Sequence, residues 1–252
     1  MLTKPGVDLP PLVADLASRK HANWAWRNFL PTVASMLHEG GYRSILEVGG
    51  GRSPSLSKDE ISELSIKYTC NDISARELSL APDWVEKALF DIQTPNTAEL
   101  DAYTGAFDFV FSQMVMEHVP SFDRAYRNIY RILEEGGVGI AFHPTLYSVP
   151  FIANRLLPDT VTRKVLKLVF PNRTDTGTPK FPAYYSGCVI STKVTDHLKE
   201  IGFRNAWQVP FYWHNYYKKF PLVRDVHTKF SDMAADMDMT FFATFAYTIV
   251  RK

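Results

Sequence analysis

The hydrophobic positions of residues 43–143 fall into short runs that alternate with helical segments. Buried strands are predicted at SILEVGGG, SIKYTCND, VEKALFDI, FDFVFSQM and GVGIAFHP, with helices through Glu77 and Leu78 and from Ser121 to Leu133. This alternation is typical of a mostly parallel sheet covered by helices on both faces. Ligands of such sheets bind beyond the carboxyl ends of the strands, so a site is expected where each strand ends.

The predicted helices carry their own start and stop residues. Ser121 is the expected N-cap of the second, whose apolar stripe is Ala125, Ile129, Ile132 and Leu133 and whose stop is Gly136 and Gly137. A further helix is expected over residues 24–40, because Trp26, Phe29, Val33 and Leu37 have helical spacing and Gly40 and Gly41 follow them. Pro31 is expected to kink it.

The chain divides into four parts on this pattern. Residues 1–42 form an N-terminal helical segment, 43–143 the core, 144–190 an inserted helical and aromatic lid, and 191–252 the end of the same domain. Within the insertion, VTRKVLKLVF places Val161, Val165, Leu168 and Val169 on one helical face. The closing MTFFATFAYTIVRK predicts a late strand, at a sheet edge or antiparallel.

Composition restricts the classes of partner and location. The 252 residues carry 28 Lys and Arg against 27 Asp and Glu, a net charge of +1, which offers no general field for nucleic acid. No apolar stretch reaches the length of a membrane span, and the N-terminus lacks the apolar core of a secretory signal. The two cysteines, Cys70 and Cys188, do not have the spacing of a zinc site. A reducing, cytoplasmic setting is expected.

A glycine turn follows the first predicted strand. Gly49 and Gly51 lack a Cβ, so their backbone can approach a ligand closely. Pro54 stands where a dinucleotide fingerprint has its third glycine. Together with Glu47 two residues before the first glycine, this favours a ligand with an amino acid tail over one with a pyrophosphate. A simple strand-to-helix turn is the alternative.

Two carboxylates close the next two predicted strands. Asp72 follows Gly51 by 21 residues, the spacing at which a carboxylate accepts hydrogen bonds from ribose hydroxyls. Asp91 closes the third strand, where it can accept the amino proton of an adenine while Ile92 packs on the ring. Either aspartate can instead cap the helix that follows it.

Taken in order, ILEVGGG, CNDIS, FDIQ and FDFVFSQMVMEHVPSFDRAYRNIYRILEEGG resemble the class I S-adenosylmethionine-dependent methyltransferases with a methyltransferase type 11-like domain. The resemblance spans residues 43–143 and implies a Rossmann-like α/β fold with seven strands and S-adenosylmethionine as cofactor. It implies that Glu47, Gly49 and Gly51 line the methionine part, that Asp72 holds the ribose, that Asp91 and Ile92 hold the adenine, and that Gln113 lies near the sulfonium. Ile73 is expected to contact the cofactor as well.

Methyl transfer to a hydroxyl group needs a base, and histidine suits that role near neutral pH. Three histidines are candidates: His118 beside Glu117, His143 at the end of the fifth strand, and His214 in the aromatic segment FYWHNYYKKF. For each, the alternative is a histidine that only orders its loop.

The second half of the chain is expected to choose the acceptor. Tyr184, Tyr185 and Trp213 can stack on a sugar or an aromatic acceptor, although core packing is the alternative for aromatic residues. Met114 stands where some relatives carry an acidic residue, so no metal site is expected.

The expected activity is O-methylation of a small molecule or a carbohydrate. The alternatives are N-methylation of a small metabolite, a non-catalytic scaffold that binds the cofactor, and an NAD-dependent oxidoreductase, against which Pro54 argues.

Overall fold

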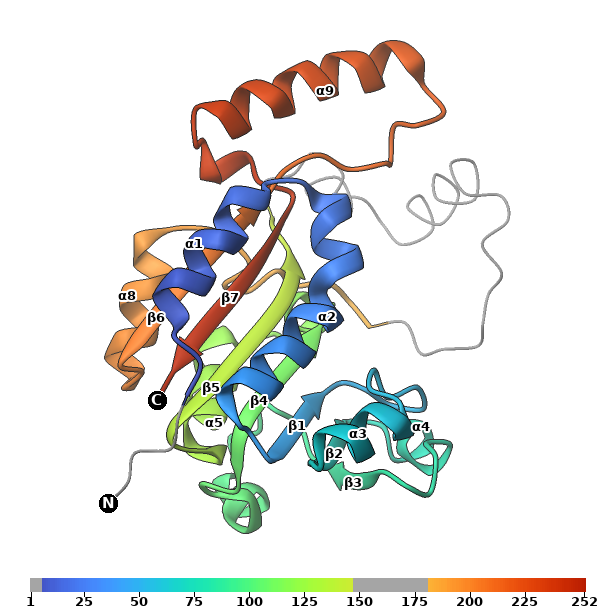
Figure 1. Cartoon of the computed structure of the whole chain (residues 1–252), viewed down its shortest axis with the longest axis vertical. Helices are drawn as coiled ribbons and strands as arrows, with labels where there is room; N and C mark the ends of the chain where they lie inside the picture. The colour runs from blue at the N-terminus through green and yellow to red at the C-terminus, as the bar shows by residue number, and fades with distance from the viewer. Residues whose placement is uncertain (1–5, 147–180) are drawn as a thin grey trace.

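A seven-stranded sheet forms the centre of the protein in a computed structural model that describes residues 6–146 and 181–252. The strand order is β3-β2-β1-β4-β5-β7-β6, with β1 to β5 parallel and β7 antiparallel between β5 and β6. The strands are β1 (Ser44–Val48), β2 (Lys67–Asp72), β3 (Glu86–Leu89), β4 (Phe107–Gln113), β5 (Leu133–Pro144), β6 (Asn205–Phe211) and β7 (Phe245–Arg251). The predicted α/β fold with a mostly parallel sheet is confirmed (Figure 1).

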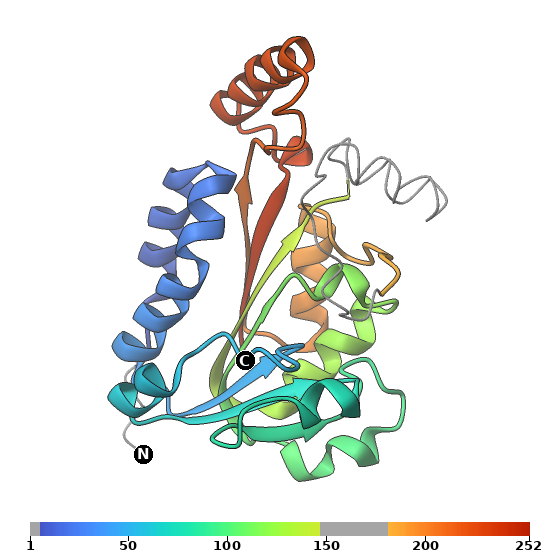
Figure 2. The same cartoon turned by 90° about the vertical axis from the view of Figure 1, so that its right-hand side faces the viewer.

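Helices cover both faces of this sheet. Helices α1 (Leu9–Arg19) and α2 (Ala22–Gly40) lie on one face, and α5 (Phe122–Ile132) and α8 (Thr192–Ile201) lie on the other (Figure 2). Helix α9 (Pro221–Asp236) lies beyond the end of the sheet, next to the start of β7 (Figure 1). The shorter helices are α3 (Lys58–Leu64), α4 (Ala75–Ser79), η1 (Thr97–Tyr103), η2 (Met116–His118) and η3 (Thr240–Phe242).

Helix α2 begins two residues before the predicted start. The His21 side chain accepts a hydrogen bond from the backbone N–H of Asn23, and Gly41 closes the helix at a φ of 65°. Pro31 lies inside the helix, as the sequence indicated. The Ser121 hydroxyl caps α5 by accepting from Arg124 N at 3.4 Å, and the predicted apolar stripe of α5 is buried.

One prediction about the end of an element was wrong. Gly136 and Gly137 do not stop α5, because the helix ends at Ile132 and β5 begins at once with Leu133. The glycines lie inside β5, near a register shift opposite Phe107 and Phe109, where Gly136 takes a φ of 82°. The last strand is antiparallel, one of the two predicted alternatives, and β6 pairs on its outer side and forms the edge.

Aromatic packing attaches α2 to the end of the sheet. Phe29 of α2 lies 5.4 Å from Phe142 and 5.3 Å from Tyr247, measured between ring centroids. The Tyr247 hydroxyl donates to the Ala25 carbonyl at 2.6 Å, so the buried phenol oxygen has a partner. The N-terminal turns of α2 are thereby held at the carboxyl end of β5.

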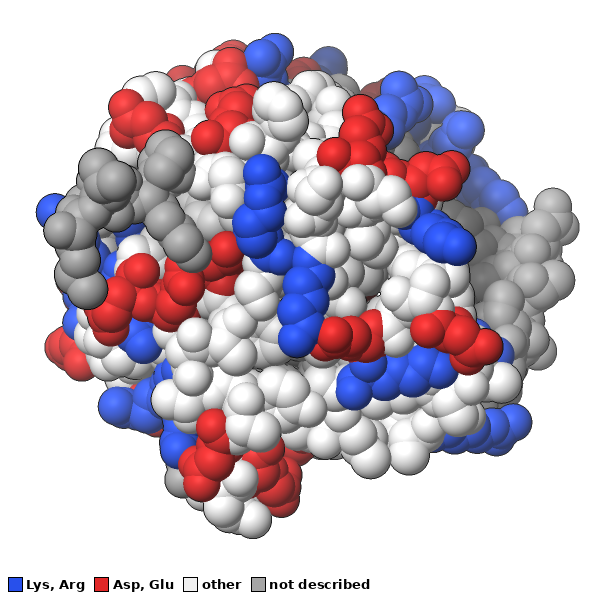
Figure 3. Space-filling model, turned by 60° about the horizontal axis from the view of Figure 1, so that its bottom comes forward, with Lys and Arg blue, Asp and Glu red and all other residues white. Residues whose placement is uncertain are grey.

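Other features bear on the sequence predictions. The predicted helix at 161–169, with most of the 144–190 insertion, lies outside the described residues. Within the described ranges, no helix is both long and apolar enough to cross a bilayer. On the face that Figure 3 shows, acidic and basic side chains are intermixed, in keeping with the balanced charge of the chain.

Candidate functional site

The glycine turn after β1 is tied to the end of β2 by its backbone. The N–H groups of Gly49 and Gly50 donate to the Asn71 carbonyl at 2.9 and 3.1 Å. Gly49 and Gly51 have φ angles of 78° and 52°, which other residues adopt at a cost. The turn therefore requires glycine at both positions that the sequence singled out.

The Asp72 carboxylate lies against this turn. A Cβ built on Gly51 would be 2.9 Å from Asp72 Oδ2, so the missing side chain leaves room for the carboxylate. Asp72 Oδ1 accepts from Ser74 N at 2.7 Å. Partial burial raises the Asp72 pKa above its ordinary value, although the Ser74 amide opposes this shift. Helix α4 is capped by Ser74, so Asp72 is not its N-cap.

Glu47 points into the protein from β1. Its buried carboxylate accepts from the Ser55 backbone N–H at 3.0 Å, and also from the hydroxyls of Ser55 and Tyr68. Burial raises the pKa of Glu47, while these donors oppose the shift. The carboxylate thus holds the far side of the glycine turn in place through Ser55.

Two side chains that the sequence analysis missed also fix the turn. The buried Asn71 amide donates to the carbonyls of Ala88 and Phe90 at 3.0 and 2.9 Å, which joins the ends of β2 and β3. Arg52 forms a two-pronged ion pair with Glu77 of α4, at 2.5 and 2.7 Å. Neither residue belongs to a spacing motif, so a single sequence gave no indication of them.

Asp91 lies two residues beyond β3, and its Oδ1 accepts from Gln93 N at 3.0 Å. Ile92 is buried, whereas Ile73, after β2, is exposed. The buried Asn128 amide of α5 donates to the carbonyls of Ile92 and Thr94, which fixes this loop. The carboxyl ends of β1, β2 and β3 are adjacent in the sheet, so the structure brings the predicted glycines, Asp72 and Asp91 to the same end of the sheet.

Gln113 ends β4, on the other side of β1 from β2. It is half-buried and pairs in register with Phe142 of β5. Met114 follows with a φ of 56° and donates its N–H to the Phe142 carbonyl at 2.8 Å. The chain turns sharply here, next to the glycine turn, since a Cβ on Gly49 would meet Val115 at 2.5 Å.

His118 and residues 181–185 lie together at the end of β4. The His118 Nδ1–H donates to the Pro182 carbonyl at 3.0 Å, which leaves the lone pair on Nε2. The backbone N–H groups of Tyr184 and Tyr185 donate to the Glu117 carbonyl. The Tyr184 side chain is 43% exposed, whereas Tyr185 is buried. Of these two predicted acceptor residues, Tyr184 is the accessible one.

The Glu117 side chain is buried beside this group. Its Oε2 has no hydrogen-bond partner among the described residues, and its Oε1 lies 3.8 Å from His118 Nε2. Burial raises the pKa of Glu117 to about 8. The side chain is therefore mostly protonated at neutral pH.

The His143 side chain is buried at the end of β5. Its Nδ1–H donates to the Pro144 carbonyl at 3.0 Å, and its Nε2 lies 2.9 Å from the Thr248 hydroxyl. Burial lowers the His143 pKa to about 4. With both nitrogens engaged and the ring buried, the geometry does not favour His143 as a base.

His214 and Trp213 lie farther along the same edge, in the loop after β6. Trp213 stacks on His21, with centroids 4.7 Å apart, and donates to Asp232 at 2.9 Å. His214 accepts from Tyr216 N at 3.3 Å and packs 3.9 Å from the His227 ring. No cluster of three or more metal-ligating side chains occurs among the residues that the structure describes.

Residues 46–141 match the family model described as a methyltransferase domain. No curated protein matches the chain significantly. Residues 46–141 are thus similar to a methyltransferase domain, and the chain has a Rossmann-like α/β fold.

Solved structures share this fold at low sequence identity. A phosphoethanolamine N-methyltransferase from Haemonchus contortus is 14% identical with a TM-score of 0.51; the match covers 83% of this chain and 48% of that one. A SAM-dependent methyltransferase from Archaeoglobus fulgidus is 14% identical with a TM-score of 0.52, covering 88% and 94%. The methyltransferase domain of the citrinin polyketide synthase is 13% identical with a TM-score of 0.50, covering 82% and 46%. The chain spans about half the length of the Haemonchus and citrinin synthase proteins.

Proposed function

We propose that the protein binds S-adenosylmethionine at the carboxyl ends of β1 to β4 and transfers its methyl group to a small acceptor. The observation that carries this proposal is the glycine turn, which is held on Asn71 and leaves room at Gly51 for the Asp72 carboxylate. A carboxylate at that place suits a ribose, and a turn without Cβ atoms suits the amino acid end of the ligand. The match of residues 46–141 to a methyltransferase domain supports the same cofactor.

The proposed cofactor contacts follow the order of the strands. Gly49 and Gly51 face the methionine part, and Glu47 acts on it by holding their turn through Ser55. Asp72 and Ile73 take the ribose, and Asp91 and Ile92 the adenine. Gln113 lies toward the reacting end, because β4 is the strand next to β1.

We assign the role of base to His118. Its side chain is 35% exposed, and its Nδ1–H is held by the Pro182 carbonyl, so that Nε2 carries the lone pair. S-adenosylmethionine supplies a methyl group activated by a positively charged sulfur. As the bond from the methyl carbon to the acceptor oxygen forms, the carbon–sulfur bond breaks and the hydroxyl proton passes to His118.

The acceptor we propose is a small molecule or a carbohydrate with a hydroxyl group. The test is incubation of the protein with methyl-labelled S-adenosylmethionine and a panel of simple phenols, sugars and amines, followed by analysis of the product. Label on oxygen supports the assignment if the His118→Ala variant loses this transfer but keeps its affinity for the cofactor. Label on nitrogen with full activity of His118→Ala would replace O-methylation by N-methylation, and no transfer to any acceptor would contradict the catalytic role.

A further inference from the structure

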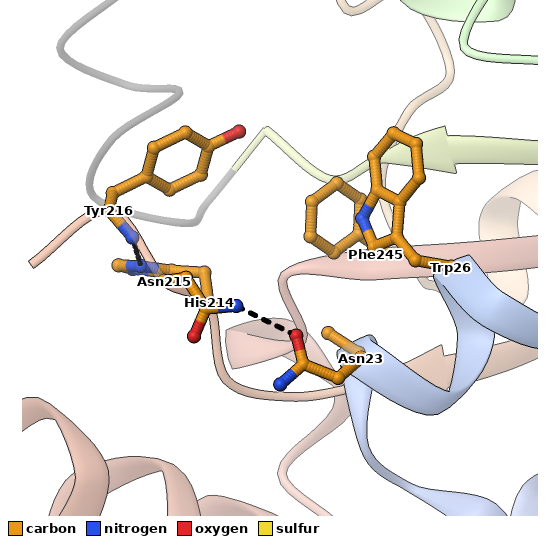
Figure 4. A pocket seen from close by; sticks show the side chains of 7 residues that line it. Asn23, Trp26, His214, Asn215, Tyr216 and Phe245 are labelled. Carbon is orange, nitrogen blue, oxygen red and sulfur yellow. Dashed lines mark hydrogen bonds between the residues drawn. The ribbon is translucent and has the colours of Figure 1, made fainter. Parts of the chain in front are cut away.

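An open pocket lies beside the start of β7 (Figure 4). Because β7 is antiparallel, its start lies at the carboxyl ends of the parallel strands, as the glycine turn does. Helix α2, the loop after β6 and the first residue of β7 supply its walls. The lining residues are Ala22, Asn23, Trp26, His214, Asn215, Tyr216 and Phe245. Of these residues, the sequence indicated His214 as a candidate base and Tyr216 as a ring that can stack on an acceptor.

The pocket is within reach of the proposed transfer site. Strand β7 is separated from β4 by β5, and neighbouring strands lie about 4.8 Å apart, so β7 is roughly 10 Å from β4. An acceptor whose ring occupies the pocket can therefore extend a substituent toward the ends of β4 and β1. From a pocket at the amino ends of the parallel strands, an acceptor could not reach the proposed cofactor in this way.

Trp26 forms a preorganised aromatic wall. Its ring makes edge contacts with Phe142 and Phe245, at centroid distances of 5.0 and 5.6 Å, and interplanar angles of 73° and 84°. The side chain nevertheless stays 42% exposed. An indole ring held by two neighbours loses little freedom when a planar ring stacks on its open side.

The polar groups of the pocket are uncharged. No Asp, Glu, Lys or Arg is among the lining residues that the structure describes. Burial and the neighbouring His227 lower the pKa of His214 to about 3, so its imidazole is neutral at pH 7. A charged ligand would lose its hydration without gaining an opposite charge, which selects for uncharged ligands.

These groups also offer hydrogen bonds to a ligand oxygen. His214 Nδ1 accepts from Tyr216 N, so the proton of the neutral ring is on Nε2, and this buried donor has no partner among the described residues. The Asn215 amide donates to Asn23 Oδ1 at 2.9 Å, which fixes both amides at the wall (Figure 4). His214 Nε2 itself has almost no accessible surface, so the Asn23 and Asn215 amides are the groups placed to bond a ligand oxygen.

The pocket volume of about 150 Å³ gives room for one ring. An apolar protein cavity of that size is known to hold a benzene molecule. From the aromatic wall, the uncharged lining, the two amides and the volume, we propose that the pocket binds a single uncharged aromatic ring with an oxygen substituent, as in a simple phenol. This inference rests on the proposed function, under which the ring is part of the methyl acceptor.

The test is binding of phenol to the full chain, measured by saturation-transfer NMR and by titration. Cyclohexanol and glucose are the comparison probes. We expect phenol to bind more tightly than either, and Trp26→Ala to weaken it by about tenfold, the value of one good ring contact. Trp26→Phe keeps a ring and should retain most of the affinity. The control Trp84→Ala removes an exposed indole before β3 and should change nothing.

Tyr216→Ala provides a second variant, because it alters the pocket from a loop and leaves the packing of α2 intact. Equal phenol affinity in the wild type, Trp26→Ala and Tyr216→Ala would overturn the inference, as would tighter binding of glucose. A parallel titration with S-adenosylhomocysteine separates the two proposals. Phenol binding that depends on Trp26 without binding of S-adenosylhomocysteine would refute the proposed function alone, and the reverse result would refute the pocket alone.

Discussion

At the scale of single residues, the proposed site depends on a missing Cβ. Gly51 has a φ of 52°, and a Cβ there would lie 2.9 Å from Asp72 Oδ2. Gly51→Ala should therefore cost about 1 kcal/mol of stability from backbone strain, and in addition weaken S-adenosylhomocysteine binding by displacing the carboxylate. Urea unfolding and calorimetric titration measure the two effects.

The chain offers a matched control for this change. Gly105 has a φ of 64° and open space around its missing Cβ. Gly105→Ala should show a similar loss of stability with unchanged ligand affinity. If both variants bind S-adenosylhomocysteine as the wild type does, the close approach of Gly51 to Asp72 has no part in binding.

Glu117 is predicted to make stability depend on pH. Its pKa is raised from 4.5 to about 8 by burial, so the folded state keeps a proton that the unfolded state loses. The stabilisation is fully present below pH 4.5 and is lost as the pH rises toward 8, at up to roughly 1.4 kcal/mol per pH unit. Glu117→Gln should remove this slope in urea unfolding measured across the window.

The matched control for Glu117 is Glu63→Gln, since Glu63 is exposed on α3. It should leave the slope of the wild type unchanged. A Glu117→Gln variant with the same pH dependence as the wild type would show that the carboxyl is not held protonated.

Residue types at strand ends could be predicted from the sequence, but their partners could not. The spacing of Gly49, Gly51 and Asp72 led to one edge of the sheet, where the structure places them. His143 stood at an equally suitable strand end, yet its ring points into the core and meets Thr248, 105 residues away. Nothing local in the sequence encodes which face a ring at the end of a strand will take.

At the scale of elements, Asn71 joins three strands. Its carbonyl accepts from the glycine turn after β1, and its amide donates to carbonyls at the end of β3. Asn71→Ala leaves two buried carbonyls without donors and should cost roughly 2 to 4 kcal/mol. Because the glycine turn shifts with it, S-adenosylhomocysteine affinity should fall as well.

Tyr247→Phe separates the two effects of Asn71→Ala. It removes one buried hydrogen bond, from the Tyr247 hydroxyl to Ala25, far along the sheet from β2. Unfolding should show a loss of about 1 kcal/mol, and titration should show unchanged affinity. Equal losses of affinity in both variants would mean that general stability, and not the join at Asn71, controls binding.

The order of elements from β1 to β5 followed from local patterns, since each strand and helix has its own period. The order of the last strands did not. Strand β7 was predicted as a strand at an edge or antiparallel, and its sequence alone did not place it, because its position inside the sheet depends on pairing with β6, about 40 residues earlier. Trp26 likewise fits the apolar stripe of α2, and its exposure at the pocket is a property of the assembled fold.

At the scale of the whole molecule, the two proposed binding sites lie side by side at the carboxyl ends of the parallel strands. The ends of β1, β2 and β3 carry the glycine turn and the two aspartates, and the start of β7 carries the aromatic pocket. Strands β4 and β5 lie between them, with His118 just after β4. With this arrangement, the proposed cofactor and the proposed acceptor would lie on either side of the proposed base.

The central claim is that this edge binds S-adenosylmethionine, and its most direct test is calorimetric titration of the wild type and Asp72→Asn with S-adenosylhomocysteine and with NAD. We expect S-adenosylhomocysteine to bind the wild type and NAD not to bind it. Asp72→Asn should lose roughly tenfold or more in affinity, while Asp101→Asn, before β4 at the opposite edge, loses none. Selective binding of NAD, or equal affinity of the wild type and Asp72→Asn for S-adenosylhomocysteine, would contradict it.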